Sequence, residues 1–314
     1  MNLQAVRHAL NGLGIMGMNH RNALYIGPLN PRHAYPTVDN KRLTKRLAAE
    51  HGIPTPELYG VIEAHRQVRD LPRLVEGRPE FVVKPCRGAA GNGIVLIASH
   101  DEKRVVKPSG EQVAWEELTY HVATILSGVH SLEGLEDEAL IEAFIHVGPT
   151  FEAVTYRGVP DVRIIVYRGV PTMAMVRLPT KRSDGRANLH QGAIGAGIAI
   201  GTGTTMAAVQ GRQVVSHHPD TGEPVAGIAV PHWDRILEIA ARGYEMTGLG
   251  YLGADVVIDR SHGPVLLELN ARPGLAIQLA NQDGLRHRLM QAEAAWRPGL
   301  GVPERVALAR SLFA

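Results

Sequence analysis

Two apolar segments near the C-terminal end, residues 252–259 (LGADVVID) and 265–270 (VLLELN), constrain the fold of this chain most strongly. The polar and turn-forming residues 260–264 separate them, which predicts an antiparallel β-hairpin. Opposed residues of such a pair have a constant index sum. We expect Ile258 to face Val265, which fixes the register of the whole hairpin.

In this register, Asp255 faces Glu268 across the hairpin. Glu268 and Asn270 are two residues apart in one strand, so both are expected on the face that carries Asp255. Mg²⁺ prefers such hard oxygen ligands and binds to one or two carboxylates plus substrate phosphates. The alternative is three polar positions on a solvent-facing sheet surface. It leaves two opposed carboxylates that repel each other unless a cation or a proton intervenes.

The rest of the chain mixes hairpins with separate helices, which favours the α+β class over a regular βαβ array. A second hairpin is predicted from residues 162–167 and 172–178, around Arg168 and Gly169. Asp39 is expected to cap a helix that runs from Asn40 to Glu50. Further expected elements are helices over residues 3–10, 111–127 and 232–247 and strands over residues 80–84, 94–98 and 139–145, whereas residues 11–37 are expected to be irregular.

A glycine-rich loop follows the strand that ends at Lys84. Its glycines, Gly88, Gly91 and Gly93, would let backbone N–H groups approach a phosphate closely, and Lys84 adds a compact positive charge. The spacing does not match the G-x-x-x-x-G-K-[ST] pattern of a P-loop. A tight β-hairpin turn is the alternative interpretation of this loop.

Composition excludes several classes of protein. The formal net charge of +2 over 314 residues gives no support for nucleic-acid binding. A lone cysteine, Cys86, allows no disulfide within the chain and fits a reducing compartment. We see no signal peptide in residues 1–17 and no apolar run long enough to span a bilayer, so a soluble, cytoplasmic protein without a membrane span is expected.

Six segments occur in the order typical of the ATP-grasp family, and the chain resembles RimK-like α-L-glutamate ligases most closely. These segments are residues 38–57, 81–94, 140–145, 160–178, 185–193 and 253–274, so that the resemblance extends over residues 36–280. It implies an ATP-grasp fold, in which two α+β subdomains clamp ATP. The implied division is a short N-terminal segment (1–37), a small subdomain with a glycine-rich flap and a hinge strand (38–145), and a large subdomain with the metal site and C-terminal helices (146–314).

The resemblance also implies roles for individual residues. Phosphate contacts would come from Lys41 and Lys84, and a flap over the phosphates from Gly88, Gly91 and Gly93. The adenine edge would meet Glu142 and the backbone of Ala143 and Phe144, with Asp161 near the nucleotide. Arg163 and Arg177 would face the acyl phosphate, Arg186 and Asn188 would meet the γ-phosphate and metal, and Asp255, Glu268 and Asn270 would be the metal ligands. A structural salt bridge is the alternative for the two arginines in the first hairpin.

The implied reaction is ATP-dependent amide formation. A substrate carboxylate attacks the γ-phosphate to give an acyl phosphate and ADP, and an amine then displaces phosphate. The implied cofactors are ATP and Mg²⁺ or Mn²⁺, with two ions expected. The implied partners are a peptide or small acceptor and an amino acid such as glutamate, and a homo-oligomer is compatible with this. A phosphotransferase on the same scaffold and a non-catalytic nucleotide-binding protein are the alternatives.

Two departures from these ligases concern the acceptor site. Only about 37 residues precede the matching segment, so the N-terminal domain that helps to shape the substrate cleft in these ligases is expected to be truncated here. Gln191 stands after the NLH segment, where a basic residue is common. The preference for acceptor charge is therefore expected to differ from that of the ligases.

Overall fold

The structure is a computed structural model that describes residues 12–88, 91–131 and 134–314. Its chain divides into two compact units. The larger unit comprises the residues up to Val38, Leu47–Pro54 and His146–Ala314, and the smaller unit comprises Asp39–Arg46 and Thr55–Ile145. No helix among the described residues is both long and apolar enough to cross a membrane.

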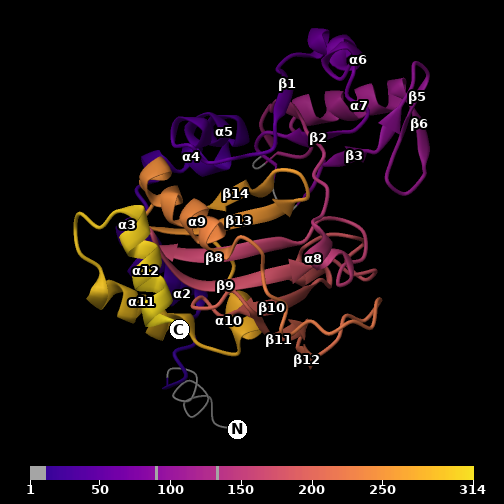
Figure 1. Ribbon diagram of the computed structural model, residues 1–314. Helices are drawn as coiled ribbons and strands as arrows, with labels where there is room; N and C mark the ends of the chain where they lie inside the picture. Colours follow the sequence, from indigo (N-terminus) through magenta and orange to yellow (C-terminus); the bar gives the residue numbers. More distant parts are fainter. Residues whose placement is uncertain (1–11, 89–90, 132–133) are drawn as a thin grey trace. The chain divides into compact units, whose positions relative to one another are not determined.

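The larger unit is built on a seven-stranded antiparallel sheet with the order β12-β11-β10-β9-β8-β13-β14 (Figure 1). Its strands are β8 (Asp161–Tyr167), β9 (Val170–Leu178), β10 (Ile194–Ile198), β11 (Thr205–Gln210), β12 (Gln213–Val215), β13 (Tyr251–Asp259) and β14 (Gly263–Asn270). Neighbouring strands of this sheet also follow one another in the sequence, except where β8 meets β13. Together with the helices, this sheet confirms the predicted α+β class.

The predicted hairpin of β8 and β9 is confirmed, and its turn explains why it forms. Arg168 and Gly169 have φ angles of 44° and 80°, and such left-handed pairs match the twist of the flanking strands. An arginine in this conformation is unusual. The N–H of Arg168 donates to the carbonyl of Gly250 at 2.7 Å, a tertiary contact that holds the turn.

The hairpin of β13 and β14 is also confirmed, but its predicted register holds only in part. Asp255 pairs with Glu268 as expected. A β-bulge follows, so that Ile258 pairs with Pro264 and not with Val265. The prediction assumed an uninterrupted ladder, whereas a bulge places an extra residue in one strand, which shifts every later pair. Asp255 still faces Glu268 because the bulge shifts the register by one residue, which offsets the one-residue error in the expected partner of Ile258.

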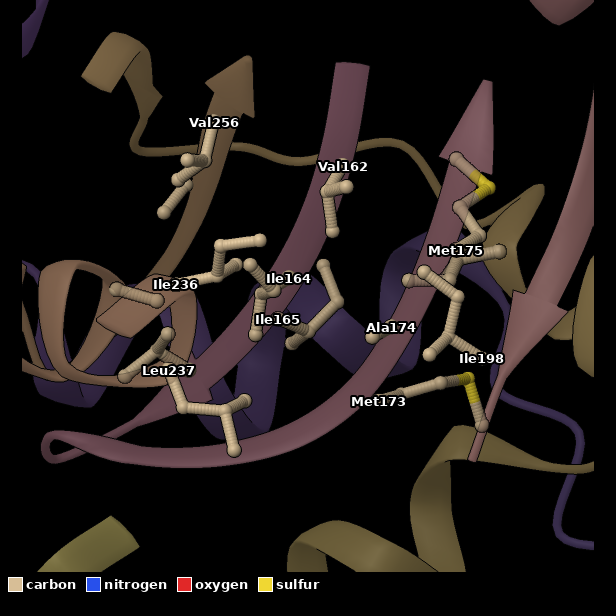
Figure 2. Close-up of a cluster of buried hydrophobic side chains, with 14 of the residues drawn as sticks. Val162, Ile164, Ile165, Met173, Ala174, Met175, Ile198, Ile236, Leu237 and Val256 are labelled. Atoms are coloured by element: carbon tan, nitrogen blue, oxygen red, sulfur yellow. The ribbon is translucent and has the colours of Figure 1, made fainter. Parts of the chain in front are cut away.

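Helices cover both faces of this sheet. Helix α9 (Trp233–Thr247) packs on β8, β13 and β14 and ends at Gly248, whose φ of 70° closes the helix as predicted. Figure 2 shows Ile236 and Leu237 of α9 beside Ile164 of β8, in the apolar core. Helix α10 (Ile277–Asn281) packs on β9, β10 and β11, and α11 (Leu285–Ala295) and α12 (Val302–Leu312) complete the C-terminal part.

Residues 18–39 form a series of short helical turns, so the expectation of irregular chain over residues 11–37 is wrong for most of this stretch. These turns are α2 (Met18–Arg21), a π turn (Asn22–Ile26), α3 (Gly27–Leu29), a 3-10 turn (Arg32–Ala34) and α4 (Pro36–Asp39). The winding changes between α, π and 3-10 turns within a few residues, and Asn30 before Pro31 is extended, so no single helical periodicity marks this stretch in the sequence. The expected helix over residues 3–10 lies outside the described residues.

The smaller unit has a four-stranded sheet with the order β1-β7-β2-β3. Its strands are β1 (Leu58–Ile62), β2 (Phe81–Pro85), β3 (Val95–Ile97) and β7 (Ala139–Glu142). A separate sheet consists of β4 (Ser99–His100), β5 (Arg104–Val106) and β6 (Gln112–Ala114), followed by helix α7 (Trp115–Leu126). The helix predicted over residues 111–127 therefore begins later, because residues 112–114 pair with β5.

Helix α5 (Lys41–Glu50) begins one residue later than predicted and has a different cap. Asp39 ends α4, and the side chain of Asn40 accepts a hydrogen bond from the N–H of Leu43 at 2.9 Å. Asparagine and aspartate cap helices equally well. Asp39 and Asn40 were therefore both possible N-caps of α5. Asn40 is the cap because Asp39 is the last residue of α4.

Candidate active site

One face of the seven-stranded sheet carries a cluster of charged side chains. Asp161 of β8 pairs with Arg177 of β9, and Arg163 of β8 pairs with Asp255 of β13. Directly opposed residues of antiparallel strands point to the same face. The pairing of Asp255 with Glu268 extends the cluster to β14. Four adjacent strands thus place these groups together, although they are up to about a hundred residues apart in sequence.

Asp255 is the centre of this cluster. Its side chain is 1% exposed and accepts from Arg163 Nε at 2.7 Å and from Arg163 Nη2 at 2.5 Å. Arg177 Nη2 donates to the same carboxylate at 2.9 Å, and Asn270 Nδ2 donates at 3.3 Å. Arg177 also holds Asp161 through two hydrogen bonds of 2.5 Å. The two arginines therefore form buried salt bridges in this structure. This is the structural role that the sequence allowed as an alternative to contact with the acyl phosphate.

Burial and charge act in opposite directions on the two aspartates. Burial raises the pKa of Asp161 to about 6, because Arg177 compensates only in part and Asp255 adds a like charge. Burial also acts to raise the pKa of Asp255, but the guanidinium groups of Arg163 and Arg177 outweigh it and hold this pKa below its usual value. Asp255 is therefore the more firmly ionised of the two carboxylates.

The donor set expected for a metal fits Mg²⁺ in kind. Two carboxylates, Asp255 and Glu268, and the amide oxygen of Asn270 are hard oxygen donors on one sheet face. In the part of the chain that the structure describes, no group of three or more His, Cys, Asp or Glu side chains is arranged to hold a metal. Both oxygens of Asp255 already accept from arginines, so a cation would have to displace these guanidinium groups.

The loop that carries Arg186 and Asn188 packs next to this cluster. Gly195 of β10 pairs with Arg177, and a Cβ atom on Gly195 would lie 2.7 Å from Leu189 Cδ2. The missing side chain lets the 3-10 turn Leu189–Gln191 rest on the sheet. The side chain of Asn188 accepts from the N–H of His190 at 3.0 Å, which caps this turn. Arg186 is exposed.

The smaller unit holds a second buried group of charges. Lys84 of β2 lies 2.6 Å from Glu142 of β7, and Lys45 of α5 lies 3.1 Å from the other oxygen of the same carboxylate. All three side chains are almost fully buried. Burial lowers the pKa of Lys45 to about 8, although Glu142 opposes this shift. Lys84 and Glu142, expected to contact phosphate and adenine, are thus bound to each other here.

Apart from Asp161, which lies on β8 of the larger unit, the other residues expected to bind the nucleotide lie in this same smaller unit. Lys41 Nζ donates to the carbonyl of Gly88 at 2.5 Å, and Gly91 and Gly93 have φ angles of 76° and 78°. The backbone N–H of Ala143, which was expected to meet the adenine edge, already donates to the carbonyl of Glu57 at 2.9 Å. Adenine would therefore have to replace this hydrogen bond. Phe144 follows directly after Ala143 and is half-buried.

Lys45 was missed by the sequence analysis. It stands four residues after Lys41 on α5, and residues at this spacing share one face of a helix. The spacing could have identified it as a second cation on the face of Lys41. Its partner could not have been found in this way, because Glu142 is almost a hundred residues further along the chain.

A family model described as sugar-transfer associated ATP-grasp matches residues 20–294. The chain therefore belongs to this ATP-grasp family, as the order of its motifs predicts. The resemblance to glutamate ligases is confirmed at low identity. A protein named "Probable alpha-L-glutamate ligase" from Maridesulfovibrio salexigens is 24% identical over 236 residues, which are 75% of this chain and 56% of that protein.

A second curated relative has the same identity, whereas the similar solved structures are more distant in sequence. The "Ribosomal protein bS6--L-glutamate ligase" of Salmonella paratyphi B is 24% identical over 79% of this chain and 60% of its own length. This chain thus spans somewhat more than half of these curated relatives. Among solved structures, D-cycloserine synthetase DcsG has a TM-score of 0.48 at 18% identity and covers 83% of this chain and 71% of its own. The D-alanine--D-alanine ligase of Bacillus anthracis has a TM-score of 0.46 at 13% identity, with coverage of 96% and 76%.

Proposed function

We propose that this protein is an ATP-dependent carboxylate–amine ligase that forms an amide through an acyl phosphate and releases ADP. The observation that supports it best is the group on the face of the seven-stranded sheet, where Asp255, Glu268 and Asn270 lie beside Arg163 and Arg177. This is the combination of hard oxygen donors and guanidinium groups that phosphoryl transfer to a carboxylate requires.

Each group has a part in the proposed reaction. Mg²⁺ held by the three oxygen donors would neutralise charge on the transferred phosphoryl group. Arg163 and Arg177 would leave their carboxylate partners and meet the acyl phosphate. In the smaller unit, Lys41, Lys84 and the loop of Gly88, Gly91 and Gly93 would bind the ATP phosphates. No covalent nucleophile on the protein is needed, so buried Cys86 has no part in this reaction.

The proposed substrates are an amino acid such as glutamate and a peptide or small acceptor. The names of the relatives, a probable α-L-glutamate ligase and a ligase that joins L-glutamate to ribosomal protein bS6, support this choice. The family description, sugar-transfer associated, adds uronic acids and amino sugars as substrates to be tested. We also propose that the protein acts in the cytoplasm, where ATP is abundant.

The test is incubation with Mg-ATP and a panel of amino acids, peptides, uronic acids and amino sugars. The proposal predicts ADP and phosphate in equal amounts, with a product whose mass corresponds to an amide. AMP and pyrophosphate would point to an adenylate and would contradict the acyl-phosphate mechanism. A stable phosphorylated product would instead identify a phosphotransferase.

A further inference from the structure

Arg272 lies two residues after the expected metal ligand Asn270 and is exposed. Its guanidinium carbon lies 4.8 Å from the centroid of the Tyr35 ring. Tyr35 is itself half-buried and packs against the apolar core of the larger unit, so it is a fixed support. A guanidinium over an aromatic face is held in place by the cation–π attraction and can still donate its in-plane N–H groups to an anion.

The backbone on both sides of Arg272 is fixed by buried side chains of the N-terminal segment. Asn30 Nδ2 donates to the carbonyl of Ala271 at 3.0 Å, and Arg21 Nη1 donates to the carbonyl of Pro273 at 2.7 Å. Asn30 and Arg21 are 3% and 8% exposed. The position of Arg272 is therefore determined by the fold and does not depend on a mobile loop.

The same backbone crosses the sheet face that carries the charged cluster. Gly253 pairs with Asn270, and a Cβ atom on Gly253 would lie 2.7 Å from Pro273 Cβ. Gly253 is two residues before Asp255, so both point to one face of β13. The absence of a side chain at Gly253 allows Pro273, which follows Arg272 directly in the chain, to pack on the face of β13 that carries Asp255.

A substrate carboxylate that approaches the charged cluster needs a positive charge, and Arg272 can supply one. Arg163 and Arg177 are already paired with Asp161 and Asp255. A carboxylate approaching this face therefore needs a cation that is not yet paired. Among the described residues, Arg272 has no carboxylate within salt-bridge distance.

We propose that Arg272, supported by Tyr35, binds the carboxylate of the substrate through its guanidinium fork. The ligand class is a small molecule or peptide end with a free carboxylate, since a planar guanidinium matches a carboxylate with two parallel hydrogen bonds. This inference rests on the proposed ligase function. It also assigns a role to the N-terminal segment, in which Tyr35 supports the guanidinium of Arg272 and Asn30 and Arg21 hold the backbone on both sides of it.

Binding can be tested without turnover. The full-length protein is saturated with Mg-AMPPNP and titrated by calorimetry with L-glutamate, D-alanine and D-glucuronate. For any acid that wild type binds, Arg272→Gln is expected to weaken binding about 10-fold or more, the loss of a charge-assisted hydrogen bond. The affinity for Mg-AMPPNP is expected to stay within about 2-fold of wild type, because Arg272 does not meet the phosphates.

Three further variants separate recognition from support. Arg272→Lys keeps the charge without the fork and should recover part of the affinity for the carboxylate. Tyr35→Phe keeps the ring and should match wild type, whereas Tyr35→Leu should weaken carboxylate binding alone. Arg78→Gln is the matched control, because Arg78 also lies over a tyrosine, 4.2 Å from the Tyr59 centroid, but in the smaller unit. It should leave carboxylate binding unchanged.

The outcomes are distinguishable. Unchanged carboxylate affinity in Arg272→Gln overturns the inference, as does the absence of binding of any carboxylate to wild type. An equal loss of affinity for Mg-AMPPNP also overturns it and assigns Arg272 to phosphate. If wild type binds a carboxylate, loses it in Arg272→Gln and yet forms no ADP with any amine, the proposed ligase function fails while the carboxylate subsite stands.

Discussion

At the scale of single residues, buried charges in both units are held by partners within the same unit. Asp255 accepts from two arginines and an amide, and Glu142 lies between Lys45 and Lys84. Asp255, its arginine and amide partners and Lys84 are residues that the proposed reaction would use. The expected ligands, phosphates and a divalent cation, would have to replace these internal partners. The energetic cost of breaking a buried pair is compensated only when the incoming group restores the charge balance.

Glu268→Gln is expected to reduce ligase turnover about 100-fold or more, because it removes charge from the proposed metal site at almost constant volume. Thermal unfolding should change little, since Glu268 is half-buried and is not the centre of the arginine cluster. Phosphate release and circular dichroism measure the two effects. Glu102→Gln, an exposed acid in the smaller unit, is the control. Near-normal turnover in Glu268→Gln would count against the site.

The low pKa of Lys45 predicts a pH dependence of stability. Its pKa is about 8 in the folded protein and 10.5 in the unfolded chain, so the unfolded chain binds more protons between these values. Stability from this group therefore rises with pH in that window, by at most about 1.4 kcal/mol per pH unit, and is constant below it. Urea unfolding at pH 8 and pH 10 should show this rise in wild type and a smaller one in Lys45→Met. Equal slopes in the two proteins would contradict the assignment.

At the scale of elements, glycines in two strands of the sheet allow loops to pack directly on the strand backbone. Gly195 admits the 3-10 turn of Leu189–Gln191, and Gly253 admits Pro273. Both glycines lie on the sheet face that carries the charged cluster, so the loops around the site are positioned by the strands beneath them. A bulge after Asp255 changes the register of the remaining hairpin without disturbing this arrangement.

Gly195→Val is expected to lower the free energy of unfolding by about 1–3 kcal/mol, because its side chain would collide with Leu189. It should also move the turn that Asn188 caps. Replacing Leu189 by alanine in the same chain should recover part of the lost stability, since it opens the space that valine needs. Urea denaturation of the single and double variants measures this coupling. Purely additive losses would show that the contact does not set the position of the loop.

At the scale of the whole molecule, the segment before residue 38 is part of the larger unit and not an appendage. Asn30 joins it to the sheet through three hydrogen bonds. Its side chain accepts from the N–H of Tyr251 and donates to the carbonyls of Tyr251 and Ala271, at 2.7–3.0 Å. Met16 and Gln278 exchange two more. The segment thus has a defined place beside the end of β14.

Asn30→Ala is expected to lower the free energy of unfolding by about 2–4 kcal/mol, because it leaves three buried backbone groups of the sheet without partners. Asn22→Ala is the control and should cost less than about 1 kcal/mol, because Asn22 is exposed and its side chain accepts hydrogen bonds from the neighbouring Arg21. Chemical denaturation of both variants measures the difference. Similar stabilities would mean that the N-terminal segment is not integral to the larger unit.

The sequence alone determined the features that depend on local order. Apolar alternation and turn residues predicted both hairpins, and Gly248 predicted the end of α9. The opposition of Asp255 and Glu268 was also predicted, although from a register near the turn that is one residue off. The order of motifs along the chain predicted the ATP-grasp family, which the family model confirms. These inferences succeed because strand alternation, turns and helix ends are set by residues close together in the chain.

Only the tertiary structure decided the rest. The bulge after Asp255, the choice of Asn40 over Asp39 as a cap, the lysine pair around Glu142 and the support of Arg272 by Tyr35 all depend on contacts between distant segments. No local pattern contains them, because burial determines which polar groups must be paired and packing determines which partner can reach them. The predicted metal ligands were thus brought together as expected, but the arginine partners that now hold Asp255 became visible only once the sheet was assembled.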